Sequence, residues 1–240
     1  MSQKWKRSTD VPFPAVWHRF TVQHPQTGDV VHYRVQDLPE ERYKEALDIM
    51  ISDFLRDEPM CRSRKCTEDP AAIADFRKIW AKVQQDKICL VCFREGSDEI
   101  MGMNFLKITQ KDAIDPPTNY CKSTSDVLNT MDYIAQQGNL FEHYGVDKFI
   151  NGYGLIVPPK NRGLKLGVEI LKARVPLAKA LGIQLTSTIF SNRASQSAAT
   201  RAGFEDSYEI SWDDLGKIEP WMYFPVSGTP TVKLQSLQIK

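Results

Sequence analysis

Residues 151–174 read NGYGLIVPPKNRGLKLGVEILKAR, and this stretch decides the fold. Its apolar run Leu155-Ile156-Val157 is typical of the end of a β-strand, and apolar residues at helical spacing begin after Gly163. Two prolines and a turn that carries Lys160 and Arg162 lie between them. Amides at a helix start have no intrahelical partner, and the helix dipole adds partial positive charge there. We therefore expect a strand, a loop and a helix, with either a phosphate site at the loop or an ordinary corner with solvated charges.

Length and composition are those of an ordinary globular protein. The chain has 240 residues, of which 42% are hydrophobic and 25% charged, and its formal net charge is +1. No global field therefore favours nucleic acid. Five cysteines are too few, and odd in number, for a disulfide scaffold. The charged start precedes no apolar stretch, and no run is long enough to span a membrane. We expect a single cytoplasmic domain over residues 1–240, with loose tails at 1–14 and 230–240 and no membrane contact.

Hydrophobic periodicity places the elements along the chain. Apolar residues at helical spacing predict helices at residues 39–55, 70–84, 124–138, 164–181 and 192–202. Apolar and β-branched runs bounded by turns predict strands at residues 16–23, 30–35, 88–93, 100–108, 149–157, 183–190, 204–210 and 221–225. Pro176 removes the hydrogen bond to the Lys172 carbonyl, so we expect a kink or an early break in the fourth helix. Gly203 suits the left-handed cap of the last helix.

Several other ligand motifs are not supported. No G-x-x-x-x-G-K-[ST] occurs, and Gly152-Tyr153-Gly154 lies within a predicted strand rather than after it, so neither common nucleotide loop is present. Cys89 and Cys92 are three apart on a strand and face opposite sides, so they cannot share one ion. The four histidines are scattered. We expect no metal site.

Three motifs, in the expected order, resemble the GCN5-related N-acetyltransferase superfamily. Arg162-Gly163-Leu164-Lys165-Leu166-Gly167 is similar to its [QR]-x-x-G-x-[GA] pyrophosphate loop, although Lys165 replaces the central glycine. Asn192-Arg193-Ala194-Ser195 with Ala202-Gly203-Phe204-Glu205 resembles its N-x-x-[AS] … G-F ending. Asp57-Glu58-Pro59-Met60 resembles the D-E-P-[LM] of insect arylalkylamine (dopamine-type) N-acetyltransferases. The resemblance covers about residues 30–225. It implies an α+β fold with a mixed, mostly antiparallel sheet flanked by helices and splayed strands that form the acetyl-CoA slot.

The resemblance also implies that acetyl-CoA is the co-substrate. The pantetheine amides would pair with exposed backbone where the strand ending at Val157 splays from residues 183–190, and the loop would hold the diphosphate. The residues expected to contact the cofactor are Leu155, Ile156, Val157, Arg162, Gly163, Leu164, Lys165, Leu166, Gly167, Val168, Asn192 and Ser195.

By the same resemblance, an amine attacks the thioester directly in a ternary complex. The amine arrives as an ammonium ion, so a base or a water relay must take its proton. Glu58 is the expected base, because it extends the apolar stripe of the first helix to a place where a carboxylate loses hydration; the alternative is a surface acid just past a helix. Ala199 stands where many members carry the tyrosine that protonates the thiolate. Ser191 and Ser195 match serines that the insect group uses, and they either serve the leaving sulfur or cap the short helix.

The expected substrate is a small primary amine such as dopamine, serotonin or tryptamine. Met60, Tyr153 and Phe190, together with Trp17 and Phe54, could wall an aromatic amine pocket or simply fill a core. Agmatine or a polyamine, a protein amine, and a coenzyme A-binding module without catalysis are the alternatives. An insertion at residues 109–147 would cover a peptide groove, which favours small substrates. The oligomeric state stays open.

Overall fold

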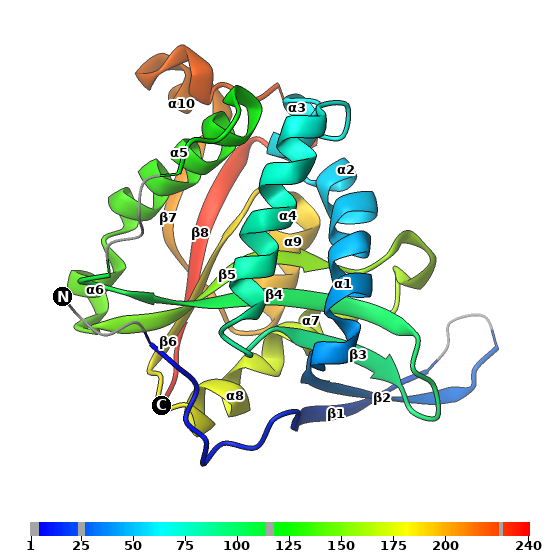
Figure 1. Ribbon diagram of the computed structural model, residues 1–240. Helices are drawn as coiled ribbons and strands as arrows, with labels where there is room; N and C mark the ends of the chain where they lie inside the picture. The colour runs from blue at the N-terminus through cyan, green and yellow to red at the C-terminus, as the bar shows by residue number, and fades with distance from the viewer. Residues whose placement is uncertain (1–4, 24–26, 114–117, 226–227) are drawn as a thin grey trace.

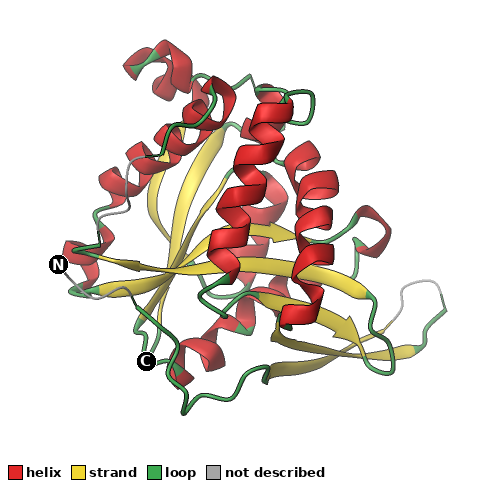
Figure 2. Ribbon diagram, in the orientation of Figure 1, coloured by secondary structure: helices red, strands yellow, loops and turns green. Residues whose placement is uncertain are grey.

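The fold is built on one sheet of eight strands in the order β1-β2-β3-β4-β5-β6-β8-β7 (Figures 1 and 2). The structure is a computed structural model that describes residues 5–23, 27–113, 118–225 and 228–240. Neighbouring strands are antiparallel except β5 and β6, so the predicted mixed, mostly antiparallel sheet is confirmed. The strands are β1 Val16–Gln23, β2 Val30–Asp37, β3 Leu90–Arg94, β4 Ile100–Gln110, β5 Lys148–Ile156, β6 Leu185–Phe190, β7 Glu205–Ser211 and β8 Thr231–Gln238.

Helices cover both faces of this sheet. Along β3, Val91 and Phe93 join one apolar cluster with α1, α4 and α5, whereas Leu90 and Cys92 join a second cluster with α7 and α8. This alternation is the two-residue period of a strand buried on both faces. The helices are η1 Glu40–Arg42, α1 Tyr43–Ile49, η2 Met50–Phe54, α2 Leu55–Asp57, α3 Pro59–Ser63, α4 Pro70–Gln84, α5 Lys122–Gly138, α6 Leu140–Tyr144, η3 Pro159–Asn161, α7 Leu166–Lys172, α8 Arg174–Ala180, α9 Arg193–Arg201, α10 Trp212–Ile218 and η4 Pro220–Met222.

The predicted break in the fourth helix is confirmed. Helix α7 ends at Lys172 and α8 begins at Arg174, because Pro176 has no N–H to donate to the Lys172 carbonyl. Gly203 has φ +94°, the left-handed conformation expected at the end of α9. Helix α4 has the predicted bounds, and Asp69 caps it by accepting a hydrogen bond from Ala71 N.

The prediction of a loose tail at residues 230–240 is wrong. Strand β8 lies between β6 and β7 and pairs with both. Val232 and Leu234 alternate with less buried residues and enter the core, so this is a half-buried strand. The predicted strand at residues 221–225 is also wrong. Pro220 opens η4 there instead, and α10, which the sequence analysis missed, precedes it.

The described part of the predicted N-terminal tail, residues 5–14, is anchored. Arg7 donates from Nη1 and Nη2 to the two carboxylate oxygens of Asp37, at 3.0 and 2.9 Å. Asp37 is fully buried, so removing Arg7 would leave its charge unpaired. Trp17 donates to the same carboxylate at 2.8 Å. The prediction of a loose arm is therefore wrong for these residues, and its first four residues lie outside the described part of the chain.

Candidate active site

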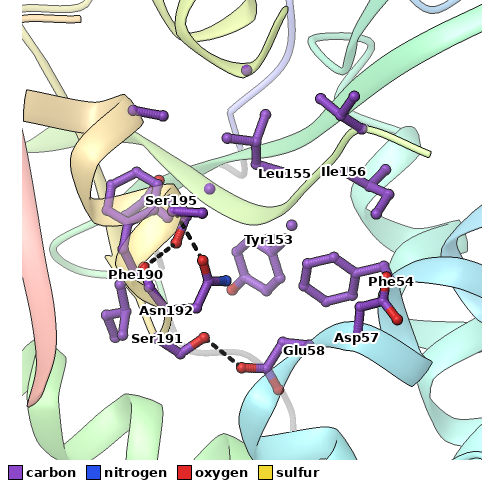
Figure 3. A pocket seen from close by; sticks show the side chains of 18 of the residues that line it. Phe54, Asp57, Glu58, Tyr153, Leu155, Ile156, Phe190, Ser191, Asn192 and Ser195 are labelled. Atoms are coloured by element: carbon purple, nitrogen blue, oxygen red, sulfur yellow. Dashed lines mark hydrogen bonds between the residues drawn. The ribbon is translucent and has the colours of Figure 1, made fainter. Parts of the chain in front are cut away.

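A cavity of about 660 Å³ lies where β5 and β6 separate (Figure 3). Its walls come from these strands, from the loop before α7, from α9 and from the helices between α2 and α5. Leu164, one of the predicted cofactor residues, does not line the cavity. It packs instead against the apolar cluster that contains residues of α7 and α8. Trp17 is also absent from the lining. The predicted residues that line the cavity are Phe54, Glu58, Met60, Tyr153, Leu155, Ile156, Val157, Arg162, Gly163, Lys165, Leu166, Gly167, Val168, Phe190, Ser191, Asn192 and Ser195.

The cavity follows the predicted splay between two strands. β5 and β6 pair only at Ile150↔Thr186 and Asn151↔Ser187, yet β5 continues to Ile156 and β6 to Phe190. Both strands stay paired on their outer sides, with β4 and β8. The facing backbone edges beyond Asn151 are therefore free of each other, and they can accept an extended ligand as a strand would. The splayed strands of the predicted fold are confirmed.

A β-bulge turns Tyr153 toward this cavity. The register passes from Phe105↔Gly154 to Leu106↔Gly152, so Tyr153 is the extra residue on β5. Its carbonyl accepts a 2.9 Å hydrogen bond from Trp80 Nε1, which satisfies a group that the bulge removes from the ladder. In Figure 3 the ring lies between Phe54 and Asn192. Tyr153 thus belongs to both the strand and the pocket wall.

The loop before α7 adopts a conformation that normally calls for glycine at two places. Gly163 has φ +88° and Lys165 has φ +57°, and a left-handed lysine costs roughly 1–2 kcal/mol. Lys165 is nevertheless the N-cap of α7, so the loop keeps its turn without the usual glycine. Arg162 donates to the Val157 carbonyl at 3.0 Å and to Asp57 at 2.5 Å. Hydrogen bonds from Arg56 and then Arg162 hold the pKa of Asp57 below its usual range.

Glu58 lies beside the residue that precedes the cap of α9. The residue is 8% exposed and caps α3, where its Oε2 accepts from Cys61 N at 2.7 Å. Its Oε1 accepts from Ser191 Oγ at 2.6 Å (Figure 3). Pro59 at the first position of α3 fixes the turn that aims this carboxylate inward. Glu58 is therefore not the surface acid of the alternative interpretation.

The two serines have different environments. Asn192 caps α9, because its Oδ1 accepts from Ser195 N at 2.9 Å. Ser195 Oγ donates to the Asn192 carbonyl at 2.9 Å, so this hydroxyl belongs to the cap. Ser191 precedes the cap and its hydroxyl is directed to Glu58. Ala199 is fully buried in an apolar cluster with Phe190 and Phe204, and its methyl group can supply no proton.

The end of the cavity near Glu58 is aromatic and aliphatic. Sequence reasoning named Phe54 and Met60 here but missed the contributions of α4 and α5, which are Phe76, Ile79, Trp80, Val127, Leu128 and Met131. Phe54 meets Trp80 edge-to-face, with ring centroids 5.6 Å apart. The helical spacing of apolar residues in α4 could have indicated this wall, because the apolar face of α4 that packs in the core also reaches the pocket. Helix α5, which lies within the insertion at residues 109–147, supplies part of this wall.

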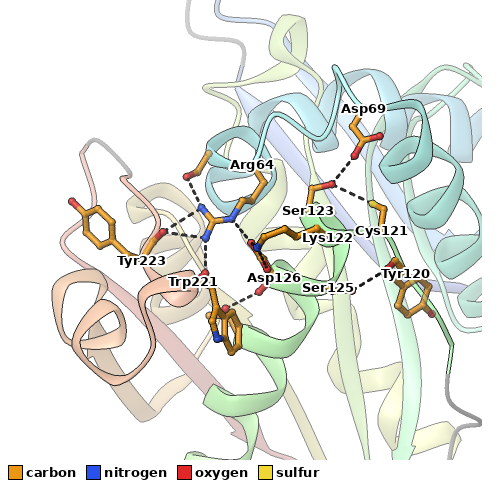
Figure 4. Close-up of polar contacts among 12 residues, drawn as sticks. Arg64, Asp69, Tyr120, Cys121, Lys122, Ser123, Ser125, Asp126, Trp221 and Tyr223 are labelled. Atoms are coloured by element: carbon orange, nitrogen blue, oxygen red, sulfur yellow. Dashed lines mark hydrogen bonds and ion pairs between the residues drawn. The ribbon is translucent and has the colours of Figure 1, made fainter.

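Arg64 fastens α5 in place (Figure 4). It follows α3 and donates from Nε to Asp126 Oδ2 at 2.9 Å, and from Nη1 and Nη2 to the Tyr223 carbonyl at 3.2 Å. Its guanidinium lies 4.1 Å from the centroid of the Phe224 ring. Asp126 directly precedes the α5 residues that line the cavity. One arginine thus joins α3, α5 and the segment after η4 around the apolar end of the pocket.

The cysteines and the acidic residues form no metal site in the described part of the chain. Cys89 and Cys92 lie in different apolar clusters, as expected for opposite faces of a strand, and burial raises the pKa of each thiol to about 12. Among the described residues, no helix is both long and apolar enough to pass through a bilayer.

Comparison with known proteins identifies the family. No protein-family model matches the chain, and no curated protein matches it. A solved structure from the yellow fever mosquito Aedes aegypti, provisionally assigned as arylalkylamine N-acetyltransferase 7, is 39% identical with a TM-score of 0.95, covering 99% of this chain and all of that one. Arylalkylamine N-acetyltransferase 2 from Aedes aegypti (18% identity, TM-score 0.76, covering 87% and 99%) and a Drosophila melanogaster polyamine N-acetyltransferase (15%, 0.70, 86% and 100%) share the fold. The chain therefore belongs to the arylalkylamine N-acetyltransferase-like family of the GCN5-related N-acetyltransferases.

Proposed function

We propose that this chain moves the acetyl group of acetyl-CoA to the primary amine of an arylalkylamine such as dopamine, serotonin or tryptamine, by direct attack in a ternary complex. The observation that carries the proposal is the 2.6 Å contact between Ser191 and Glu58, within a cavity that joins the gap between β5 and β6 to an aromatic wall. A carboxylate, a free strand edge and an apolar pocket are the three parts that this reaction needs.

The cofactor would lie along β5. The backbone of Leu155, Ile156 and Val157 would pair with its amides, and residues 162–168 would hold the diphosphate through amides and through the ammonium of Lys165. Asn192 and Ser195 line the opposite side of the same cavity. This placement is supported by the lack of pairing between β5 and β6 beyond Asn151.

The chemistry assigns each polar group a task. Glu58 takes the proton of the incoming ammonium ion, directly or through water, and the freed nitrogen attacks the thioester carbonyl carbon. The carbon–sulfur bond then breaks, sulfur leaves with the electron pair, and the second proton of the attacking nitrogen passes to the leaving thiolate, directly or through water, so that a neutral amide and coenzyme A result. Ser191 orients the carboxylate by donating to it. Ser195 is the second candidate, as a donor to the leaving sulfur if its hydroxyl turns away from the Asn192 carbonyl.

The charge of the pocket favours an amine with one cationic group. Among the described residues, the carboxylates that line the cavity belong to Asp57 and Glu58. Asp57 already accepts from Arg56 at 2.7 Å and from Arg162 at 2.5 Å. Agmatine and polyamines carry a second cation that would find no unengaged carboxylate here, and burying it unpaired is costly. An aromatic ring matches the remaining wall.

We place this activity in the cytoplasm, because the cysteines of the chain are those of a protein in a reducing compartment. All five cysteines are free thiols, and four of them are buried. Disulfides are rare in the cytosol, where thiols are kept reduced.

An amine panel with purified protein tests the proposal. Thiol release from acetyl-CoA is followed with dopamine, serotonin, tryptamine, agmatine and spermidine, alongside calorimetry of acetyl-CoA alone. We expect kcat/KM for the aryl amines to exceed that for the two polycations by about tenfold or more. Heat from acetyl-CoA without thiol release would identify a binding module, and a reversed order of substrates would identify a polyamine enzyme.

A further inference from the structure

Arg201 is a cation in the lining of the cavity to which the proposed acetyl transfer gives no task. It is the last residue of α9, it is exposed, and it lines the cavity. Within the described part of the chain, its guanidinium takes part in no hydrogen bond or ion pair. A cation in the last turn complements the helix dipole wherever its side chain points, so the dipole does not account for a place in the cavity lining.

The loop before α7 contributes the other cations of the lining. Among the described residues that line the cavity, these are Arg162 and Lys165. Arg162 already donates to Asp57 at 2.5 Å and to the Val157 carbonyl at 3.0 Å. The side chain of Lys165 has no partner in the part of the chain that the structure describes. Lys165 and Arg201 are therefore the unpaired cations, and coenzyme A carries two separate phosphate groups, the diphosphate and the 3′-phosphate of its ribose.

Helix α9 gives these cations an order along the cavity. Its residues that line the cavity share one face of the helix, and they are Ala194, Ser195, Ala198 and Arg201. Ser195 lies at the capped start of α9, which Ser191 and Glu58 adjoin. A helix rises about 1.5 Å per residue, so Arg201 lies roughly 9 Å further along the axis than Ser195. Arg201 is thus at the end of α9 that is remote from the proposed base.

The loop before α7 lies beside the middle of this face of α9. A Cβ added to Gly167 would lie 4.0 Å from the Cβ of Ala198. Arg201 follows Ala198 by three residues, about one helical turn, on the side away from Glu58. A coenzyme A molecule with its thioester near Glu58 and its diphosphate against residues 162–168 has only its ribose, 3′-phosphate and adenine beyond the loop. These are the groups that the last turn of α9 would meet.

Of these groups, the 3′-phosphate matches an exposed arginine best. A phosphomonoester carries a charge of about −1.5 to −2 at pH 7, and the planar guanidinium can donate two parallel hydrogen bonds to it. The backbone at the end of a helix presents carbonyl groups and partial negative charge, so a side chain has to supply the positive charge there. Adenine is neutral and offers an arginine only stacking.

We propose that Arg201 binds the 3′-phosphate of coenzyme A and makes this chain select coenzyme A thioesters over their 3′-dephospho forms. The inference rests on the proposed acetyl transfer, since it takes residues 162–168 to hold the diphosphate. The two unpaired cations of the cavity then bind different phosphate groups of one cofactor, Lys165 the diphosphate and Arg201 the 3′-phosphate.

Calorimetry with coenzyme A and 3′-dephospho-coenzyme A tests this in the unaltered protein. The two ligands share the diphosphate and the pantetheine arm, so they differ only in the group assigned to Arg201. We expect the dephospho form to bind about tenfold more weakly, because it lacks a hydrogen-bonded charge pair. Equal dissociation constants overturn the proposal. If coenzyme A itself does not bind, the proposed function fails and the inference fails with it.

Variants assign the selectivity to this residue. Arg201→Gln should bind both ligands as weakly as the parent binds the dephospho form, whereas Arg201→Lys should retain part of the difference. Arg193→Gln is the matched control and should behave like the parent, because Arg193 is an exposed arginine of the same helix outside the cavity lining. Lys165→Gly should weaken both ligands by the same factor. If Arg201→Gln keeps the full difference, or weakens both ligands alike, Arg201 does not bind the 3′-phosphate.

Discussion

Ser191 Oγ donates a 2.6 Å hydrogen bond to Glu58 Oε1, joining residues 133 positions apart in the chain. Glu58 comes from the turn between α2 and α3, and Ser191 directly follows β6. Both residues line the cavity that joins the cofactor strands to the aromatic wall. It also occupies one carboxylate oxygen and leaves the other on the Cys61 amide, so the carboxylate has a defined orientation toward the pocket.

The first prediction concerns the proposed base. Glu58→Gln keeps the size of the side chain but cannot take a proton, so kcat should fall roughly hundredfold to ten-thousandfold. The calorimetric Kd for acetyl-CoA should stay unchanged. The glutamine amide oxygen can still accept from Cys61 N, so the loss of charge at the cap of α3 should cost about 1 kcal/mol or less of unfolding free energy.

The control for this variant is Asp69→Ala, which removes the cap of α4 outside the cavity. It should cost a similar unfolding free energy and leave kcat unchanged. Equal loss of activity in both variants would mean that Glu58 acts through stability alone.

Substitution of Ser191 and of Ser195 by alanine should lower kcat by different amounts. Ser191→Ala removes a hydrogen bond to a charged group, which is worth about 1.5 kcal/mol or more, so kcat should fall about tenfold. Ser195→Ala removes a hydroxyl bonded to the Asn192 carbonyl, and its effect should be smaller. Steady-state kinetics at saturating acetyl-CoA compares them. A larger loss for Ser195→Ala would transfer the leading role to Ser195.

Lys165 provides a test of the loop. Lys165→Gly relieves the strain at φ +57° but adds freedom to the unfolded chain, so the unfolding free energy should change by less than about 1 kcal/mol. Removing the ammonium should weaken acetyl-CoA binding about tenfold if it bonds to a phosphate. Calorimetry at low and moderate salt measures this.

Lys160→Ala is the comparison, because Lys160 pairs with Glu99 at 2.5 Å and lies outside the cavity lining. Its acetyl-CoA affinity should match that of the parent. If Lys165→Gly binds as tightly as the parent, the loop holds the diphosphate through backbone amides without this cation.

Arg64 should control the amine end of the pocket. Arg64→Ala removes the hydrogen bonds to Asp126 and to the backbone carbonyls of Trp221 and Tyr223, and we expect a loss of roughly 2 kcal/mol in unfolding free energy. Since α5 then loses its fastening, KM for the amine should rise several-fold while the acetyl-CoA Kd stays the same. Arg42→Ala, which removes an arginine that stacks on Phe93 and bonds to Glu45 away from the cavity, should leave KM unchanged. A rise in KM for both variants would point to general loosening.

Local patterns predicted the elements near the site with accuracy because each depends on neighbouring residues. The apolar stripe of α4, the break before Pro176 and the left-handed Gly203 follow from backbone sterics and from side-chain periodicity within one or two turns. The facing of Cys89 and Cys92 follows from the period of a strand. The strand, loop and helix of residues 151–174 likewise mark where the cavity lies.

Long-range pairing limited the prediction elsewhere. Strand β8 was expected to be a tail because nothing in its eight residues indicates that β6 and β7 leave an edge for it. Arg174 was also missed. Its place between Leu171 and Leu177 indicates from the sequence that it lies on a buried helix face. The sequence does not indicate which groups surround it. Its contacts come from β4, β5 and β6, which meet only in the folded sheet.

The sequence by itself determined the main strands and helices up to β7, the basic loop after β5 and the family motifs, since these depend on residues close together in the chain. Only the tertiary structure decided that Glu58 meets Ser191, that Lys165 takes a left-handed turn without glycine, and that Arg174 is buried among the neutral side chains of Asn104, Thr186 and Thr188. These relations depend on how the separating strands β5 and β6 are held by β4 and β8. That arrangement depends on contacts between strands throughout the sheet, so no single segment of the sequence specifies it.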